Sequence, residues 1–268
     1  MAEKLCCLTC DIEMDYGWRV RQFNILKENR REIAELGDLA RMLDVPLSLF
    51  IVTRLLDDYP ELNQVVRELG KDWHTHSHTH NLNAFNSRNE FTSMVESFKT
   101  HFGYHPLGYR APLGVLRDGE IDLLKECGLS FSASVFPSYR PGQFNYMDKP
   151  TQPFRYENGL LELPFATFPK VRAILSLSYL KLYGWPLFRL LAAGAGLPEI
   201  LVLDSHLHDY FINETSFRQL PLKLRLAWGR NGGRGNELFT RFVHFLRERD
   251  YRFLTMTELY EHVKQRAG

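Results

Sequence analysis

Histidines occupy every second position of the stretch "DWHTHSHTH", from His74 through His76 and His78 to His80. Such a cluster is typical of a metal site. However, an extended chain rises about 3.3 Å per residue, which would separate the first and last histidines by roughly 20 Å. Zinc binds each nitrogen at about 2.0 to 2.1 Å, so all four cannot share one ion. Two pairings remain open: His76 with His78 on a flat strand, or His76 with His80 on a coiled turn.

Acidic and basic side chains follow other predicted strands. In "TCDIEMD", Asp11 and Glu13 are two residues apart and project from the same face of a strand. One carboxylate can ligate a metal while the other accepts a proton from water. Arg110 in "GYRAP", and His206 and His208 in "LDSHLHD", also follow predicted strands. Because βα-barrel enzymes place their chemistry at the carboxyl ends of strands, we expect these residues to meet.

Strand and helix patterns alternate along the chain, which favours a parallel sheet with crossover helices that forms a closed or nearly closed βα barrel. We predict one domain over residues 1–268. Buried strands are predicted at 4–13, 45–52, 107–112, 130–136, 160–165, 199–206 and 251–256. Helices are predicted at 24–43, from a capping box at 87–90 to about 102, at 117–128, from an Asn236 cap to about Arg249, and after a cap formed by Thr255 and Glu258.

The composition limits the possible partners and compartment. The 268 residues include 33 basic and 32 acidic side chains, a formal net charge of +1 that does not favour nucleic acid as a partner. The N-terminal sequence "MAEKLCCLTCDIE" lacks a small-residue cleavage site, so we expect a cytoplasmic protein. Cys7 and Cys10 form a CxxC, but on a strand they point to opposite faces, which predicts buried thiols and not a redox pair.

The segment 173–198, "AILSLSYLKLYGWPLFRLLAAGAGLP", is strongly apolar. Lys181, Pro186 and Arg189 interrupt it, so it cannot cross a bilayer as one helix. It predicts core packing or, alternatively, a surface that faces a membrane or a lipid.

Together, "LTCDIE", "LFIV", "HSHTH", "GYRAP", "SVFP" and "YRFLTMTELYE" resemble, in order, the polysaccharide deacetylases of carbohydrate esterase family 4, which share the chitooligosaccharide deacetylase homology domain. This resemblance covers nearly the whole chain. It implies a distorted (β/α)7-type barrel in the α/β class.

The resemblance implies a set of metal ligands. The family's histidine motif falls on His76, Ser77 and His80, which makes the two histidines ligands of one divalent ion. His74 and His78 then support the site or are exposed. The first motif departs from the commoner adjacent acids, because Ile12 follows the aspartate. It is similar to the T-x-D-x-E branch, which makes Glu13 the third ligand. The resemblance favours Zn²⁺ as this ion, with Co²⁺, Ni²⁺ or Mn²⁺ as alternatives.

The resemblance also implies catalytic roles. Asp11 is the base, and Arg110 matches the arginine that holds it. The acid is His206 if "ILVLDSHLHDY" is aligned with the H-P-W/Y-E branch, and His208 if it is aligned with the L-x-H-D branch; we prefer His206. The family commonly supports this acid with an aspartate where this chain has Ser132.

Three further residues, Tyr109, Pro112 and His208, are expected to bind substrate. Asp204 or Asp209 could replace the aspartate that this chain lacks at Ser132.

The expected reaction is metal-dependent hydrolysis of an N-acyl group on an amino sugar, on a free metabolite or on a glycolipid. The basic run "LKLRLAWGRNGGR" and the apolar segment 173–198 suit a lipid carrier with its phosphates and a peripheral membrane contact. Two alternatives stay open: a hydrolase of a ureide or cyclic imide, and an inactive sugar-binding barrel.

Overall fold

The computed structural model describes residues 3–17, 19–81, 83 and 87–266. Its strands are β1 (Lys4–Ile12), β2 (Leu47–Ile51), β3 (Asp72–Thr75), β4 (Gly108–Tyr109), β5 (Phe131–Ser132), β6 (Tyr139–Arg140), β7 (Phe144–Asn145), β8 (Phe154–Arg155), β9 (Leu161–Glu162), β10 (Ile200–Leu203) and β11 (Tyr251–Phe253). The main sheet has the order β10-β1-β2-β3-β4-β5-β9-β8, with β11 also paired to β1. Its pairs are parallel except β8 with β9, and β6 and β7 form a separate antiparallel pair.

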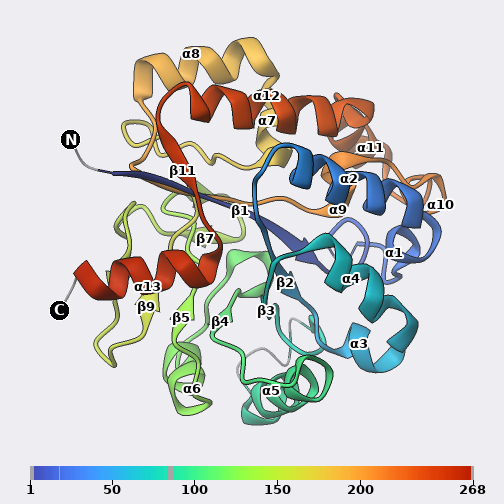
Figure 1. Ribbon diagram of the computed structural model, residues 1–268, viewed down its shortest axis with the longest axis vertical. Coiled ribbons are helices and arrows are strands. Elements are labelled where there is room, and N and C mark those ends of the chain that lie inside the picture. Colours follow the sequence, from blue (N-terminus) through green and yellow to red (C-terminus); the bar gives the residue numbers. More distant parts are fainter. Residues whose placement is uncertain (1–2, 18, 82, 84–86, 267–268) are drawn as a thin grey trace.

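Helices surround this curled sheet (Figure 1), with α8 and α12 above it and α5 and α6 below it in that view. The α-helices are α1 (Asn24–Glu28), α2 (Arg30–Met42), α3 (Arg54–Asp58), α4 (Asn63–Leu69), α5 (Arg88–Phe102), α6 (Glu120–Glu126), α7 (Leu177–Tyr183), α8 (Trp185–Ala195), α9 (Leu207–Tyr210), α10 (Glu214–Phe217), α11 (Leu222–Gly229), α12 (Gly235–Arg247) and α13 (Met256–Arg266). Short 3₁₀ turns lie at η1 (Pro60–Leu62), η2 (Pro112–Gly114) and η3 (Gly232–Arg234).

Strand β1 is buried on both faces, because neighbours cover it inside and outside the barrel. Even-numbered residues from Cys6 to Ile12 pack beneath the surrounding helices, whereas Leu5 and Cys7 belong to a cluster inside the barrel. Alternation along the strand carries the inward face to Asp11 at the carboxyl end. The pattern that makes β1 a core strand therefore also delivers an acid to the barrel mouth.

The barrel closes without a complete ladder. In the described residues no strand pair joins β8 to β10, the two ends of the sheet. Instead, the chain after β9 crosses the gap, where the Phe165 N–H donates to the Val135 oxygen and the Ala166 N–H donates to the Val202 oxygen, both at 2.9 Å. This arrangement confirms the predicted distorted βα barrel.

Several predicted elements are shorter in the structure, and the strands predicted at 107–112 and 160–165 pair only over Gly108–Tyr109 and Leu161–Glu162. Two further boundaries were wrong for local reasons. The helix predicted at 24–43 is two helices, because Asn29 leaves the helical region with φ −101° and ψ 37°. The strand predicted at 130–136 pairs only over Phe131–Ser132. Beyond it, the N–H groups of Ser134 and Val135 bind the Glu162 carboxylate and not a neighbouring strand.

Helix caps were predicted with mixed success. The Thr255 N–H donates to Glu258 and the Glu258 N–H donates to the Thr255 hydroxyl, which confirms that capping box. At α5 the Ser87 hydroxyl accepts from the Glu90 N–H. The Glu90 carboxylate is used elsewhere, so that box is only half formed. The predicted Asn236 cap is wrong, because α12 begins at Gly235.

The CxxC thiols are buried and not paired, as predicted. Cys7 and Cys10 lie in clusters on opposite faces of β1. Burial raises the pKa of both thiols well above its ordinary value. They are therefore inert packing residues.

The apolar segment 173–198 folds into α7 and α8, separated at Gly184, and contributes Leu177, Leu180 and Phe188 to the core. Among the described residues, none of the helices combines the length and hydrophobicity that a bilayer crossing demands. Several leucines of this segment nevertheless face outward.

A glycine in β4 tests how tightly the barrel interior is packed. A Cβ added at Gly108 would overlap the Phe131 ring in the next strand. We expect Gly108→Ala to lower the free energy of unfolding by about 1 to 3 kcal/mol, the usual cost of overpacking.

Denaturant unfolding measures this loss, and Gly194→Ala is the matched control. Gly194 lies in α8, where an added Cβ meets no atom within 4 Å, so alanine should leave stability unchanged or raise it by up to about 1 kcal/mol. Equal effects at the two positions would contradict the tight contact between β4 and β5.

Candidate active site

Residues from four strand ends meet at the barrel mouth. Asp11 is the penultimate residue of β1, and Glu13 follows the strand on the same inward face. His76 follows β3, Arg110 follows β4 and His206 follows β10. The structure thus brings together the residues that the strand-end argument assembled from the sequence.

The histidine run leaves the strand in a tight turn. Ser77 and His80 adopt positive φ angles of 64° and 55°, and the His80 N–H donates to the Ser77 hydroxyl at 3.0 Å. The Glu90 carboxylate accepts from the backbone N–H groups of both His78 and Thr79, at 2.9 and 2.6 Å. The coiled alternative for the histidines is therefore the one that the chain adopts.

Three buried side chains point their ligand atoms at one another. The Glu13 Oε2 atom lies 3.1 Å from His76 Nε2 and 2.7 Å from His80 Nε2. Ligand atoms around one tetrahedral zinc ion lie roughly 3.3 Å apart, given bonds of about 2.0 to 2.1 Å. The spacing of these three atoms is therefore close to that of a shared ion.

The hydrogen bond that orients His76 also supports a shared metal site. His76 Nδ1 lies 3.0 Å from the backbone oxygen of Arg110, a contact in which the nitrogen must donate. In the neutral ring the Nε2 lone pair then faces the Glu13 carboxylate. Either a proton on Nε2 or a divalent ion can lie between these two groups, so the residues fit a metal that takes the place of the proton.

The charge state of Glu13 also suits a ligand. Burial alone would raise the pKa of Glu13, but the charge of His80 and hydrogen bonds from His76 and His80 hold that pKa well below its ordinary value. Glu13 is therefore ionised at neutral pH. Two other groups of potential ligands lie nearby, His206 with His208 and Asp209, and Asp11 with Asp204 and His206. Each includes the partly exposed His206, whereas all three members of the Glu13 group are buried.

The other two histidines of the run lie apart from these ligand atoms. His74 is buried, contacts Asp72 at 2.8 Å and packs against Phe50 and Phe131. His78 contacts the Thr53 hydroxyl at 3.0 Å through Nδ1. Both are supporting residues.

Arg110 holds Asp11 from within the barrel. Its guanidinium is 1 % exposed and donates to Asp11 Oδ1 at 2.5 Å and to the Ala133 backbone oxygen at 3.1 Å. The rings of Phe50 and Phe165 cover it, with centroids 3.8 and 4.4 Å from its central carbon. This packing fixes the arginine, and the arginine fixes the carboxylate.

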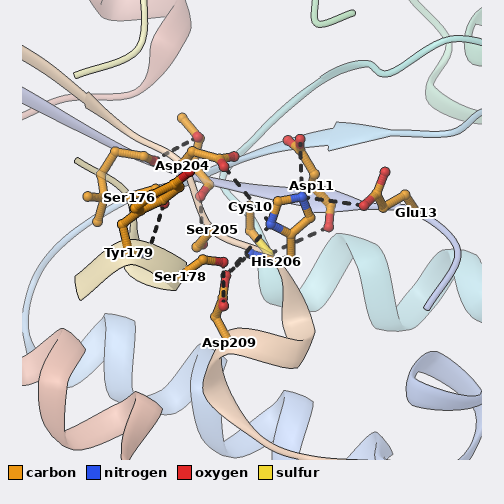
Figure 2. A network of polar contacts seen from close by, with 12 residues as sticks. Cys10, Asp11, Glu13, Ser176, Ser178, Tyr179, Asp204, Ser205, His206 and Asp209 are labelled. Carbon is orange, nitrogen blue, oxygen red and sulfur yellow. Dashed lines mark hydrogen bonds and ion pairs between the residues drawn. The ribbon is translucent and has the colours of Figure 1, made fainter. Parts of the chain in front are cut away.

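His206 lies between two sets of carboxylates (Figure 2). Its Nε2 atom is 3.3 Å from Glu13 and 3.9 Å from Asp11, whereas Nδ1 is 3.6 Å from Asp209 and 4.0 Å from Asp204. Burial alone would lower the pKa of His206, but Asp204, Asp209 and the other carboxylates raise it well above its ordinary value. The ring is thus suited to hold a proton.

His208 differs from His206 in its surroundings. It is buried against the rings of Tyr16 and Trp228. Burial lowers its pKa to about 3, so His208 is neutral at pH 7. Its side chain lines the pocket described below.

Ser132 stands where the related family has an acid, and here it donates to the Ser134 hydroxyl at 2.8 Å inside the core. Asp204 and Asp209, suggested from the sequence as replacements, are the carboxylates next to His206 Nδ1. Asp209 is buried and accepts from the His206 N–H at 3.0 Å and from the Ser178 hydroxyl at 2.6 Å. It therefore orients the histidine through its backbone as well as its ring.

A cavity of about 270 Å³ opens above these residues. Asp11, Glu13, His76 and Arg110 form its base. Segments that sequence reasoning did not assign to the site form its walls, with the apolar side chains Phe136, Phe165, Ile174, Leu182, Leu224 and Trp228 and the polar side chains Arg140, Gln143, Ser176, Ser178 and Tyr179. The sequence signals for these walls were the apolar segment 173–198 and the basic run that contains Leu224 and Trp228, which were both suggested to suit a lipid carrier.

Two expected substrate-binding residues are corrected by their positions. Tyr109 is fully buried and donates to Glu120 at 2.7 Å, because it points away from the barrel interior next to the inward-facing Arg110. Pro112 is also buried, and the cavity is lined instead by its neighbours Ala111 and Leu113.

Comparison with known families finds one match, over a little under half of the chain. Residues 15–132 match the model of the polysaccharide deacetylase family. This match confirms the resemblance to the polysaccharide deacetylases that the sequence motifs indicated. It includes His76, His80 and Arg110, whereas Asp11, Glu13 and His206 lie outside the matched segment.

Solved structures extend the shared fold to almost the whole chain. A protein classed as a polysaccharide deacetylase from Mycobacterium smegmatis has a TM-score of 0.63 at 17% identity, over 98% of this chain and 92% of that one. A second so classed, from Pseudomonas aeruginosa PAO1, has a TM-score of 0.61 at 15% identity, over 97% and 91%. The Puue allantoinase has a TM-score of 0.60 at 16% identity, over 97% and 90%. A search of curated protein sequences finds no match.

The proposed ligand set makes a direct prediction about metal content. We expect purified wild-type protein to bind one divalent ion per chain, and His76→Ala and His80→Ala each to lose it, because two remaining ligands cannot hold the ion tightly. Elemental analysis and zinc titration by calorimetry measure this. His78→Gln is the matched control from the same turn and should keep the ion. A metal-free His78→Gln beside a fully loaded His80→Ala would show that the ligands are assigned in the wrong register.

Proposed function

We propose that this protein is a metal-dependent amide hydrolase that removes an acetyl or other small acyl group from an amino sugar. The observation that carries the proposal is the convergence of Glu13 with His76 and His80 next to Asp11 and His206. Such a set offers a cation site, a base and an acid around one cavity. The family match supports deacetylation of carbohydrate as the general reaction.

Glu13, His76 and His80 would hold the ion, with Zn²⁺ as the first choice for one carboxylate and two imidazoles. When bound, a divalent ion supplies a Lewis acid that polarises the acyl carbonyl and acidifies water. As the oxygen of the attacking water bonds to the acyl carbon, Asp11 accepts a proton from that water. Arg110 donates a charge-assisted hydrogen bond to that carboxylate and orients it.

His206 completes the reaction from the opposite side of the pocket. As the carbon–nitrogen bond breaks, the leaving nitrogen takes a proton from the ring, and the products are a free amine and a carboxylic acid. The carboxylates beside Nδ1 favour the protonated ring. The low pKa of His208 argues against that residue as the acid and supports the preference for His206.

The cavity supports a substrate of modest size. Its volume of about 270 Å³ is slightly below the usual range for ligand sites, about 300 to 1,000 Å³, so one sugar residue fits better than a polymer segment. The walls combine aromatic faces with hydroxyl and amide groups, as sugar sites require. More specifically, we propose that the substrate is a lipid-linked saccharide.

A second candidate function is hydrolysis of a ureide or cyclic imide, which the structural likeness to an allantoinase favours. The two reactions use the same base and acid. A screen of zinc-loaded protein against N-acetylated amino sugars, nucleotide sugars and allantoin, with detection of the released amine or carboxylate, separates them. Metal-loaded protein that binds sugars and turns over none of these compounds would favour the inactive sugar-binding barrel.

We expect Asp11→Asn to retain the metal and lose about 10²- to 10⁴-fold in turnover, because a neutral amide cannot accept the proton of water. Steady-state kinetics on the best amide substrate measure the loss. Metal content and a cooperative thermal melt are the controls, since Arg110 loses its charged partner in this variant. A turnover number near that of wild type would remove Asp11 from the mechanism.

The acid is tested by comparing leaving groups. His206→Gln should slow hydrolysis of an N-acetyl amine about 10²- to 10⁴-fold while hardly changing hydrolysis of a nitrophenyl acetate, whose leaving group needs no proton. His208→Gln is the matched control and should affect both substrates alike. An amide-selective defect in His208→Gln alone would transfer the acid role to that residue.

A further inference from the structure

Helix α11 has an unusual surface for its composition. Five of its eight residues are apolar, Leu222, Leu224, Leu226, Ala227 and Trp228, yet none of the eight is buried. Leu222 is 64 % exposed and Leu226 is 70 % exposed, and their i, i+4 spacing places them on one face. A helix that is apolar on more than one side is normally covered. This face of α11 therefore requires a partner.

The exposed face continues into the candidate active site. Helix α11 packs against α7, and Leu224, Ala227 and Trp228 line the cavity beneath it. Leu182 of α7 also lines the cavity and is 42 % exposed. We call Leu182, Leu222, Lys223, Arg225 and Leu226 the mouth surface. Whatever covers this surface also covers the entrance to the pocket.

Charge is distributed unevenly between this region and the rest of the chain. Residues 163–198 and 215–236 contain nine of the 33 Lys and Arg residues and none of the 32 Asp and Glu residues. The same two stretches hold six of the ten large apolar side chains that are most exposed among the described residues. Of the nine, Lys181 is buried next to Asp209, and Arg218 and Arg234 pair with the flanking acids Glu214 and Glu237. The other six basic side chains make this region both cationic and apolar.

Charge is also distributed unevenly within the pocket, with acids at its base and arginines at its rim. Its acids, Asp11, Glu13 and Asp204, are buried at the base, whereas Arg19 and Arg140 line it and are exposed. The Arg19 guanidinium lies 6.0 Å from the centre of the Trp228 ring, which joins the rim to α11. A molecule that approaches the entrance therefore meets positive charge and leucine side chains together.

We propose that the mouth surface docks on the surface of an anionic phospholipid bilayer, so that the pocket opens directly at the membrane. In the docked protein, the leucine side chains leave water and enter the boundary between headgroups and acyl chains. The basic side chains beside them contact headgroup phosphates. A second copy of the chain fits less well, because a symmetric pairing would set the same positive charges against each other. As an extension that rests on the proposed function, the amino sugar reaches the pocket on a lipid anchored in that bilayer.

Vesicle flotation tests the docking separately from catalysis. We expect wild-type protein to float with vesicles of phosphatidylglycerol and phosphatidylcholine and to remain behind with phosphatidylcholine alone. Lys223→Gln combined with Arg225→Gln should reduce partitioning about 30-fold, the factor for two basic residues near an anionic surface. Leu222→Ser combined with Leu226→Ser should reduce it at least about tenfold. Met42→Ser is the control, because Met42 is 78 % exposed beside Glu35 and Asp38 and should not contribute.

Several results would overturn the proposal: no flotation with anionic vesicles, equal flotation with both vesicle types, or unchanged flotation of both double variants. Light scattering that shows a wild-type dimer which the leucine variant dissociates would assign the surface to a second copy instead. Turnover of a soluble N-acetyl amine reports separately on the proposed function, and it should be unchanged in both double variants. Loss of flotation with retained turnover supports the docking, and flotation without any turnover confines the failure to the proposed chemistry.

Discussion

Four buried carboxylates within one small volume constrain the rest of this site. Asp11, Glu13, Asp204 and Asp209 all lie around His206 at the ends of β1 and β10. Buried like charges are costly unless cations neutralise them nearby. The fold meets this requirement with histidines on the Glu13 side and with the buried guanidinium of Arg110 on the Asp11 side. The carboxylates at the ends of β1 and β10 therefore explain why the neighbouring strand ends carry histidine and arginine side chains.

Much of this arrangement could be predicted from the sequence because strand geometry is regular. Alternation along β1 places Asp11 and Glu13 together whatever the exact strand ends are. The carboxyl ends of parallel strands share one edge, so Arg110 and His206 could be assigned to the same mouth before any coordinates. The thiols of the CxxC were separated by the same argument. These predictions needed only the period of a strand and the order of the elements.

Other features depend on contacts that local patterns do not contain. The turn that unites His76 with His80 requires positive φ angles at two residues without glycine, and Glu90 from α5 stabilises it. Tyr109 was expected in the pocket, yet it directly precedes the inward-facing Arg110, and adjacent residues on a strand face opposite ways. The pocket walls come from residues 136–182 and 224–228, whose strands and helices are short and whose meeting depends on the whole fold.

The pairing of β1 has a consequence for the order in which the chain folds. Leu5 pairs with both Ile200 and Arg252, so the last third of the chain supplies the whole of one neighbour of the central strand, β10, and on the opposite edge it supplies β11. During synthesis the ribosome therefore releases β1 and its neighbour β2 long before β10 and β11 exist, and long-range pairings of this kind form slowly. The aspartate of β1 and the histidine after β10 can meet only once residue 206 has emerged. The candidate site is accordingly completed in one late step, and a chain that stalls before β10 has the turn with His76 and His80 but lacks His206.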